Sequence, residues 1–251
     1  MDYADGFATL LRCFEGRARE RAFLAGLAAG HPRNGRAADW GAGSGDLTRL
    51  LLDRFDEVHA IEPDAAMRTA LVAACPSAVV HAGTLQETVL PAPVAFAIAS
   101  HVLYHLPEAA WGPAVRHMAG QLALGGVLAV GLKAAHTGCN AMLRHFGAAP
   151  FDLRATLAPA LAGVPGLSVA FHDVPGRVAT QDFDDTLRIT RFLLADRPVQ
   201  AYPAPPAPRD VEAYVHAHLW DAASGRGGWN CDTVFCVVRY APGATQGESP
   251  C

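Results

Sequence analysis

The chain has 251 residues, of which 51% are hydrophobic, and this size and composition fit one α/β domain with elaborations. Its formal net charge is −4 and no basic run offsets that balance, so we expect no nucleic-acid partner. The first residues, MDYAD, lack the apolar segment of a secretory signal. The least charged stretch, 88–107, is broken by prolines and histidines, so no membrane helix is expected. We expect a cytoplasmic protein with six reduced cysteines.

Apolar residues recur every three or four positions between Tyr3 and Ala29, which predicts helix over this segment. The sequence HPRNG at 31–35 ends the pattern, because proline, asparagine and glycine favour turns. Residues 1–35 are therefore expected to form an N-terminal helical cap.

Beyond the cap, short apolar strands alternate with helices. The predicted strands are Arg36–Trp40, Glu57–Ile61, Ala78–His81, Val94–Ala99 and Gly126–Leu132. The predicted helices between them are Asp46–Asp53, Ala65–Ala74 and Ala109–Gln121. Alternation at this interval favours right-handed βαβ crossovers and a mostly parallel sheet.

After residue 132 the alternation is less regular. Helices are predicted at Asn140–Phe146, Asp152–Leu161, Asp182–Asp196 and Asp210–Asp221. The remaining strands are predicted at Leu167–Val174 and Thr233–Tyr240. We expect a Rossmann-like sheet of seven strands with helices on both faces, six strands being parallel and the last antiparallel near the edge. This domain would span 36–240 and include an α-helical lid insertion at about 180–222, followed by a flexible tail at 241–251.

The segment that begins at Asp39 reads D-W-G-A-G-S-G, an acid followed by three glycines at alternate positions. Such glycines permit a tight turn from strand to helix and let the backbone approach a ligand closely. Dinucleotide-binding folds share this logic but use G-x-G-x-x-G, whose helix faces a pyrophosphate. A dinucleotide site and an ordinary turn without a ligand are the alternatives.

This spacing resembles motif I of the class I S-adenosylmethionine (SAM) methyltransferases. The resemblance implies SAM as cofactor and S-adenosyl-L-homocysteine as product. Asp39 would suit the ammonium group of SAM, and Glu62, at the end of the next strand, would accept both ribose hydroxyl protons. The backbone at Gly41 and Gly43 would lie against the cofactor.

Later segments continue the resemblance and imply further cofactor contacts. The run I-E-P-D-A-A-M resembles a ribose-binding loop and implies Pro63 and Met67. The segment G-T-L-Q-E, after the third strand, implies Thr84 and Leu85 near the adenine, and Ser100 would reach the methionine end. The fourth strand departs from the family pattern, because an alanine, Ala97, takes the place of its usual acid.

His101, Tyr104 and His105 follow the fourth strand, at the sheet edge where ligands bind in open α/β folds. An acceptor must present a free lone pair to the methyl group, so a histidine could serve as general base and Tyr104 could shape the pocket. Packing roles for these side chains are the alternative. No metal site is expected, since no acid lies nearby.

The whole chain resembles more narrowly the histamine N-methyltransferase-like enzymes. That resemblance implies Glu15, Trp229 and Asp232 as substrate-binding residues, which would offer two carboxylates to a cationic acceptor. A solvated helix face for Glu15 and a turn role for Asp232 are the alternatives.

We expect an enzyme that transfers methyl groups to an N or O atom of a small molecule, with N ahead of O. Bacterial specialised metabolism, such as antibiotic biosynthesis, is the expected setting, and the enzyme would be a monomer or homodimer. The alternatives are a SAM-binding enzyme of non-methylating chemistry, such as a cyclase or decarboxylase, and a non-catalytic SAM-binding protein.

Overall fold

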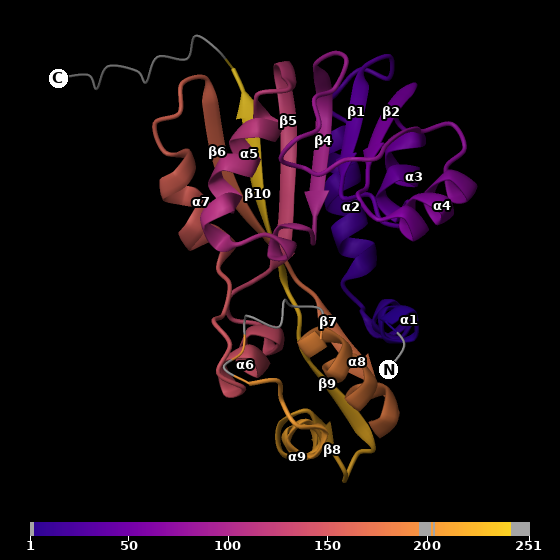
Figure 1. The fold of residues 1–251 in the computed structure, drawn as a ribbon, viewed down its shortest axis with the longest axis vertical. Helices are drawn as coiled ribbons and strands as arrows, with labels where there is room; N and C mark the ends of the chain where they lie inside the picture. Colours follow the sequence, from indigo (N-terminus) through magenta and orange to yellow (C-terminus); the bar gives the residue numbers. More distant parts are fainter. Residues whose placement is uncertain (1–2, 196–201, 203, 242–251) are drawn as a thin grey trace, which may run out of the picture. The chain divides into compact units, whose positions relative to one another are not determined.

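The computed structural model describes residues 3–195, 202 and 204–241. The contacts within the chain divide it into two compact units, each built from segments distant in sequence (Figure 1). Unit 1 consists of Met1–Glu20, Lys133–Asp152 and Asp173–Val234. Unit 2 consists of Arg21–Leu132, Leu153–His172 and Phe235–Cys251.

Unit 2 is built on a seven-stranded sheet in the order β3-β2-β1-β4-β5-β10-β6. Its strands are β1 (Arg36–Trp40), β2 (Glu57–Ile61), β3 (Val79–His81), β4 (Val94–Ser100), β5 (Leu122–Lys133), β6 (Leu167–Val174) and β10 (Thr233–Tyr240). The pairs from β3 to β5 are parallel. The arrowhead of β10 points opposite to that of β4 (Figure 1), and β10 lies between β5 and the edge strand β6. The predicted position of the last strand is confirmed.

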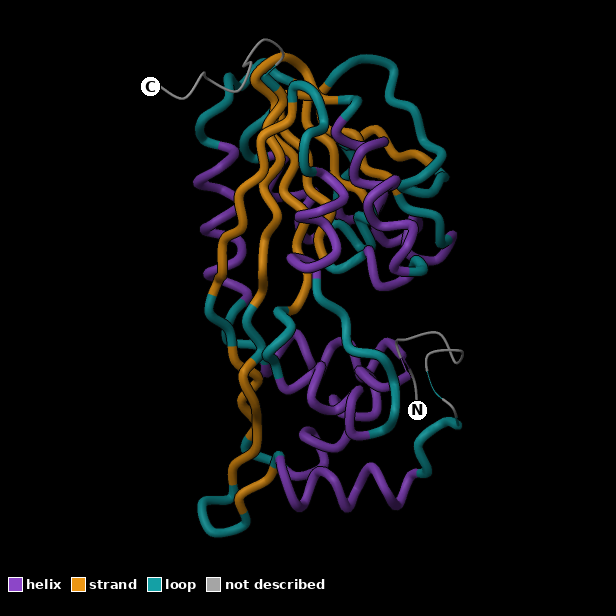
Figure 2. The backbone as a smooth tube through the Cα atoms, turned by 90° about the vertical axis from the view of Figure 1, so that its left-hand side faces the viewer, coloured by secondary structure: helices purple, strands orange, loops and turns teal. Residues whose placement is uncertain are grey.

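Helices lie on both sides of this sheet (Figure 2). They are α2 (Arg17–Ala28), α3 (Asp46–Leu52), α4 (Ala65–Ala74), α5 (Trp111–Ala119) and α7 (Leu153–Leu161), with short 3-10 turns η1 (Leu103–His105) and η2 (Glu108–Ala110). The central strands are buried along almost their whole length, as expected for a parallel sheet covered on both faces. The Rossmann-like fold is therefore confirmed. No helix within the described residues is long and apolar enough to span a membrane.

The strand register brings the carboxyl ends of three strands to the same edge. Asp39 of β1 lies opposite Ala60 of β2 and Ile98 of β4. The turn after β1, the residue after β2 and the residues after β4 therefore follow one another along this edge, where open α/β sheets bind ligands.

Unit 1 combines helices with a small antiparallel sheet in the order β7-β9-β8. Its helices are α1 (Tyr3–Cys13), α6 (Gly138–His145), α8 (Phe183–Ala195) and α9 (Pro208–His218), and its strands are β7 (Arg177–Thr180), β8 (Trp220–Asp221) and β9 (Arg226–Asn230). Helix α1 packs on α8, where the ring centroids of Phe7 and Phe192 lie 6.0 Å apart. An ion pair of 2.7 Å joins Arg12 and Asp185 across the same contact.

The structure departs from the sequence-based prediction in unit 1. The predicted helix from Tyr3 to Ala29 is two helices, because Phe14 forms a β-bridge with Val178 and the Glu15 N–H donates to the Arg177 carbonyl at 2.9 Å. The helical periodicity of the sequence on both sides of Phe14 gives no sign that this residue pairs with a strand more than 160 positions away.

The small sheet was not predicted either. The helix predicted to reach Asp221 ends at His218, because Trp220 and Asp221 pair with Gly227 and Arg226. Helices α8 and α9 occupy the predicted lid insertion, but a closing role for them stays a prediction, as do the domain boundaries. Asp196 and the tail after residue 241 lie outside the described residues.

Candidate functional site

The turn between β1 and α3 carries three glycines with positive φ angles: 78° at Gly41, 53° at Gly43 and 92° at Gly45. A Cβ atom added at Gly41 would lie 2.1 Å from Val102 Cγ1, and one added at Gly45 would lie 2.8 Å from Cys75 Sγ. At Gly43 an added Cβ atom would meet nothing within 4 Å. Internal packing therefore accounts for two of the glycines, whereas Gly43 borders open space that a ligand can approach.

Glu62 follows β2 and joins the glycine turn to the next loop. Its Oε2 accepts a hydrogen bond from the Gly43 N–H at 2.8 Å, and its Oε1 accepts one from the Asp64 N–H at 2.9 Å. A carboxylate oxygen can accept more than one hydrogen bond, so both oxygens can take a further hydroxyl donor. This arrangement suits the predicted ribose contact.

Asp39 lies at the end of β1 and is only 2% exposed. Burial raises the pKa of Asp39 to about 7, although a hydrogen bond of 2.7 Å from the Thr48 hydroxyl opposes the shift. A cation placed nearby would favour the ionised form and lower this pKa. The buried carboxyl can therefore respond to the ammonium group of the predicted cofactor, and Thr48 is a partner that the sequence did not single out.

The loop between β2 and α4 has a fixed shape. The carboxylate of Asp64 caps α4 by accepting the Met67 N–H at 2.8 Å, and Arg68 Nη1 donates to the Glu62 carbonyl at 3.0 Å. Pro63 is exposed and Met67 is half-buried. Their predicted cofactor contacts stay predictions, but the loop that carries them is held by its own hydrogen bonds.

Thr84 and Leu85, after β3, are both half-buried. The hydroxyl of Thr84 donates to Glu87 Oε2 at 3.0 Å, and its oxygen keeps acceptor capacity for an amine such as that of adenine. Ser100 ends β4 and pairs with Gly131 of β5, and Ala97 is fully buried inside the same strand. An acid at that buried position would be costly to desolvate.

His101 is the one non-glycine residue with a positive φ among the described residues, at 58°. Its N–H donates to the Gly131 carbonyl at 2.8 Å, which ties this backbone to the end of β5. The neighbouring Val102 is the residue that excludes a side chain at Gly41. Backbone strain of this kind costs about 1–3 kcal/mol and concentrates at functional sites, so it favours a role for His101 beyond packing.

Tyr104 and His105 lie in η1, with ring centroids 4.8 Å apart. Tyr104 is half-buried and His105 is exposed. The structure thus brings the three predicted catalytic residues to one edge of the sheet, and the strained backbone distinguishes His101 from the other two.

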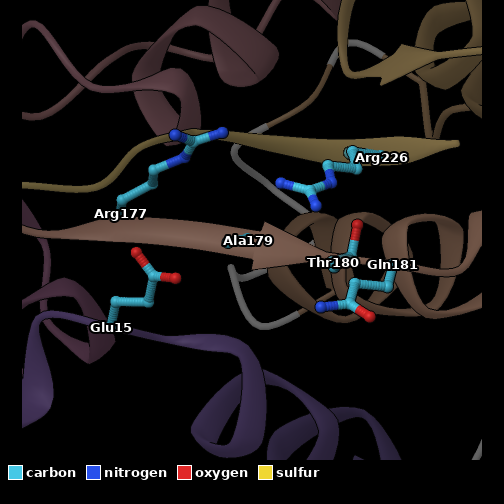
Figure 3. Close-up of a pocket in the computed structure, with 7 residues that line it drawn as sticks. Glu15, Arg177, Ala179, Thr180, Gln181 and Arg226 are labelled. Carbon is cyan, nitrogen blue, oxygen red and sulfur yellow. The ribbon is translucent and has the colours of Figure 1, made fainter. Parts of the chain in front are cut away.

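Glu15, in unit 1, lines a pocket of about 180 Å³ (Figure 3). The other lining residues are Arg177, Ala179, Thr180, Gln181, Arg226 and Gly227. None of these was singled out from the sequence. The sequence R-V-A-T at Arg177–Thr180 does not alternate polar and apolar residues, so it carries no clear strand signal, and the alternating burial along β7 is visible only in the structure.

Asp232 and Trp229 do not line this pocket. The Oδ1 of Asp232 accepts the Gly176 N–H at 2.8 Å, and its Oδ2 bonds to His136 Nε2 at 2.9 Å. Partial burial acts against ionisation, but these bonds together with one from Asn230 lower the pKa of Asp232. Its carboxylate therefore holds a turn in place. A role in substrate binding stays a prediction for Asp232, and also for Trp229, which is buried.

Comparison with known proteins identifies the region around the glycine turn. Residues 38–130 match a protein family described as "Methyltransferase domain". No curated protein matches the chain.

Solved structures share the fold at low sequence identity. N-methyltransferase NodS from Bradyrhizobium japonicum WM9 is 13% identical, with a TM-score of 0.56 over 90% of this chain and 97% of that chain. The YcgJ protein from Bacillus subtilis is 12% identical, with a TM-score of 0.62 over 89% and 98%. The [4+2]-cyclase SpnF is 15% identical, with a TM-score of 0.54 over 88% and 81%. A second structure of NodS contains S-adenosyl-L-homocysteine, with the same TM-score of 0.56.

The residues at the sheet edge suit a SAM molecule. Open space at Gly43 admits a ligand close to the backbone, Glu62 can accept additional hydrogen bonds, and Asp39 is a carboxyl whose ionisation a cation would favour. The matched domain, the strand order and these residues agree. The chain carries a class I SAM-dependent methyltransferase domain, and S-adenosylmethionine is the cofactor of that domain.

Proposed function

We propose that this enzyme transfers a methyl group to a nitrogen atom of a small molecule, with oxygen as the less favoured acceptor atom. The observation that carries the proposal is His101, held at φ 58° directly after β4 and next to the residue that packs on the glycine turn. An imidazole at this edge can take the proton that a protonated amine must lose before it reacts.

The bound cofactor supplies an activated methyl group on a sulfonium. The chain's own residues then have three tasks. Glu62 and the glycine turn orient the donor, Asp39 balances its positive charge, and His101 accepts the acceptor's proton. Positioning and proton removal are the two contributions that a transfer from an already activated donor needs.

A nitrogen acceptor is supported by two features. One fold relative, NodS, is named an N-methyltransferase. The imidazole of His101 suits a protonated amine, which has to lose a proton before it reacts. We further propose a reaction of bacterial specialised metabolism, such as antibiotic biosynthesis, in the cytoplasm. The bacterial names of two fold relatives support a bacterial setting.

A second candidate is a reaction in which no methyl group moves. The fold is shared with a protein named a [4+2]-cyclase, which makes such chemistry possible on this scaffold. The two candidates differ in their products, since S-adenosyl-L-homocysteine accumulates only if a methyl group is transferred.

The test is incubation of the full chain with SAM labelled in its methyl group and a panel of small amines, phenols and carboxylates. We expect label in an amine together with one equivalent of S-adenosyl-L-homocysteine. Label in phenols alone would reassign the acceptor atom to oxygen. Consumption of a substrate without S-adenosyl-L-homocysteine would contradict methyl transfer and favour the second candidate.

A further inference from the structure

The pocket in unit 1 contains two arginines on one face of the small sheet. Ala179 of β7 pairs with Gly228 of β9, so these two residues lie on the same face. Side chains alternate along a strand, which places Arg177 and Arg226 on that face as well, and both are exposed. The small residues Ala179 and Gly228 leave the space between the arginines free of bulky side chains.

The guanidinium groups of Arg177 and Arg226 point toward one another (Figure 3). Within the part of the chain that the structure describes, neither side chain forms an ion pair or a hydrogen bond with another residue. In the strand register Arg177 lies opposite Asn230 and Arg226 lies opposite Asp221, so the two arginines are not direct cross-strand partners. An anion between the two guanidinium groups could contact both, because the planar fork of arginine matches the oxygens of a carboxylate or a phosphate.

Glu15 enters the same pocket from the segment after α1. Its N–H bond to the Arg177 carbonyl fixes its backbone beside β7, and its carboxylate points toward that strand (Figure 3). The pocket therefore presents two positive charges and one negative charge to a ligand. A molecule with an oxyanion group and a protonated amine would complement this arrangement.

We propose that the Arg177 and Arg226 pair binds the oxyanion group of a small molecule, and that Glu15 binds its amine. The ligand would then belong to the class of small amines that carry a carboxylate or phosphate group. This inference goes beyond the proposed function, because the pocket is formed within unit 1 and its occupation requires no methyl transfer.

Binding can be measured without turnover. Calorimetric titration of the full chain with inorganic phosphate, and separately with acetate, compares Arg177→Gln and Arg226→Gln with the unaltered protein. Each substitution should weaken binding about tenfold, because one charge-assisted contact is lost. Arg209→Gln is the matched control, since Arg209 lies on α9 outside the pocket and its side chain is 89% exposed. Equal affinities in all four proteins would overturn the oxyanion site, and tighter binding of phosphate than of acetate would assign the site to phosphorylated amines.

A second titration tests the class of ligand. An α-amino acid is compared with its amide, which keeps the amine but lacks the carboxylate. We expect tighter binding of the amino acid than of the amide. In Arg177→Gln and Arg226→Gln the amino acid should bind about tenfold more weakly, with little change for the amide. Amino-acid binding that is the same in both variants and in the unaltered protein would overturn this inference, and it would leave the proposed function standing because the labelled-SAM assay does not depend on this pocket.

Discussion

The glycine turn of unit 2 and the arginine pocket of unit 1 offer different means of recognising a ligand. The glycine turn works through backbone: positive φ angles, N–H groups and one carboxylate, Glu62, that bonds two of those N–H groups. The pocket works through side chains that come from β7, β9 and the segment after α1. The turn is continuous in sequence over about one strand–turn–helix unit, whereas the pocket joins positions that are far apart along the chain.

The two sites therefore differ in how many amino-acid substitutions each can tolerate. The glycine turn is constrained at all three glycines by their positive φ angles, and at Gly41 and Gly45 also by clashes that an added Cβ atom would make. Exposed arginines on a sheet face can be replaced without disturbing the fold, so the ligand preference of such a pocket can change while the scaffold is kept. The sheet edge of unit 2 is therefore the constrained side of this comparison, and the pocket of unit 1 is the adaptable one.

The largest expected effect concerns His101, whose strained backbone belongs to the constrained side. Replacing His101→Gly should lower kcat by about 10²–10⁴-fold, the usual contribution of a general base. Glycine adopts a φ of 58° without steric cost, so the stability of the protein should stay equal or rise by roughly 1 kcal/mol. Turnover with labelled SAM and denaturant unfolding measure the two effects. Unchanged kcat would remove His101 from the reaction, and His105→Gly, measured in parallel, tests the other predicted histidine.

The second effect is the pH dependence that Asp39 confers. Its pKa is raised to about 7, so between pH 4 and 7 the folded protein holds a proton that the unfolded chain has lost. Stability should therefore fall as pH rises through this window, by roughly 4 kcal/mol in total, and stay level above it. Asp39→Asn should flatten the curve.

SAM affinity should show the opposite trend between pH 5 and 7. If the cofactor binds the ionised form of Asp39, affinity rises with pH up to about tenfold per unit and then levels off. Calorimetry over this range checks the expectation. A pH-independent affinity in both the unaltered protein and Asp39→Asn would show that Asp39 does not sense the cofactor.

The contrast between the continuous glycine turn and the discontinuous pocket also explains how much of each site can be predicted from the sequence. Asp39, the glycines and Glu62 occur within 24 positions of one another, and strand–helix alternation locates them at one sheet edge. Thr48 contacts Asp39 and Val102 packs against Gly41, but both residues could be identified only from the structure, because each contact depends on how a helix or loop packs against the turn. The sequence does not predict that Arg177 and Arg226 lie together. The strand β9 contains two glycines, which weaken its strand pattern, and its pairing with β7 spans a long insertion.

A third prediction separates packing from ligand approach within the glycine turn. Gly41→Ala should destabilise the protein by about 3 kcal/mol, because its Cβ atom would lie 2.1 Å from Val102 Cγ1. Gly43→Ala should cost only about 1 kcal/mol of stability, from its positive φ, yet weaken SAM binding. Thermal unfolding and calorimetry measure the two quantities. Val102→Ala in the Gly41→Ala background should recover part of the loss, and no recovery would contradict the steric explanation.

A smaller effect is expected at Glu62. Replacing Glu62→Gln leaves only one oxygen to accept the N–H groups of Gly43 and Asp64, and it reduces the acceptors available to the ribose. SAM binding should weaken by about 1–3 kcal/mol, the range for unmet hydrogen-bonding groups. Glu57→Gln is a control at the opposite end of β2, where the half-buried carboxylate pairs with Arg36 at 2.8 Å. Equal SAM affinity in Glu62→Gln and the unaltered protein would remove the ribose assignment.

The smallest effect tests whether Asp232 belongs to the acceptor side or only to the fold. Asp232→Asn removes the negative charge that pairs with His136 and weakens the bond that holds Gly176, so stability should fall by about 1 kcal/mol. If Asp232 also faces a cationic acceptor, the KM for that acceptor rises while kcat stays the same. Asp210→Asn is the control for loss of one exposed carboxylate charge with its ion pair, since Asp210 lies on α9 and pairs with Arg209 at 3.4 Å. A KM equal to that of the control, together with the loss of stability, would make Asp232 a turn residue with no part in acceptor binding.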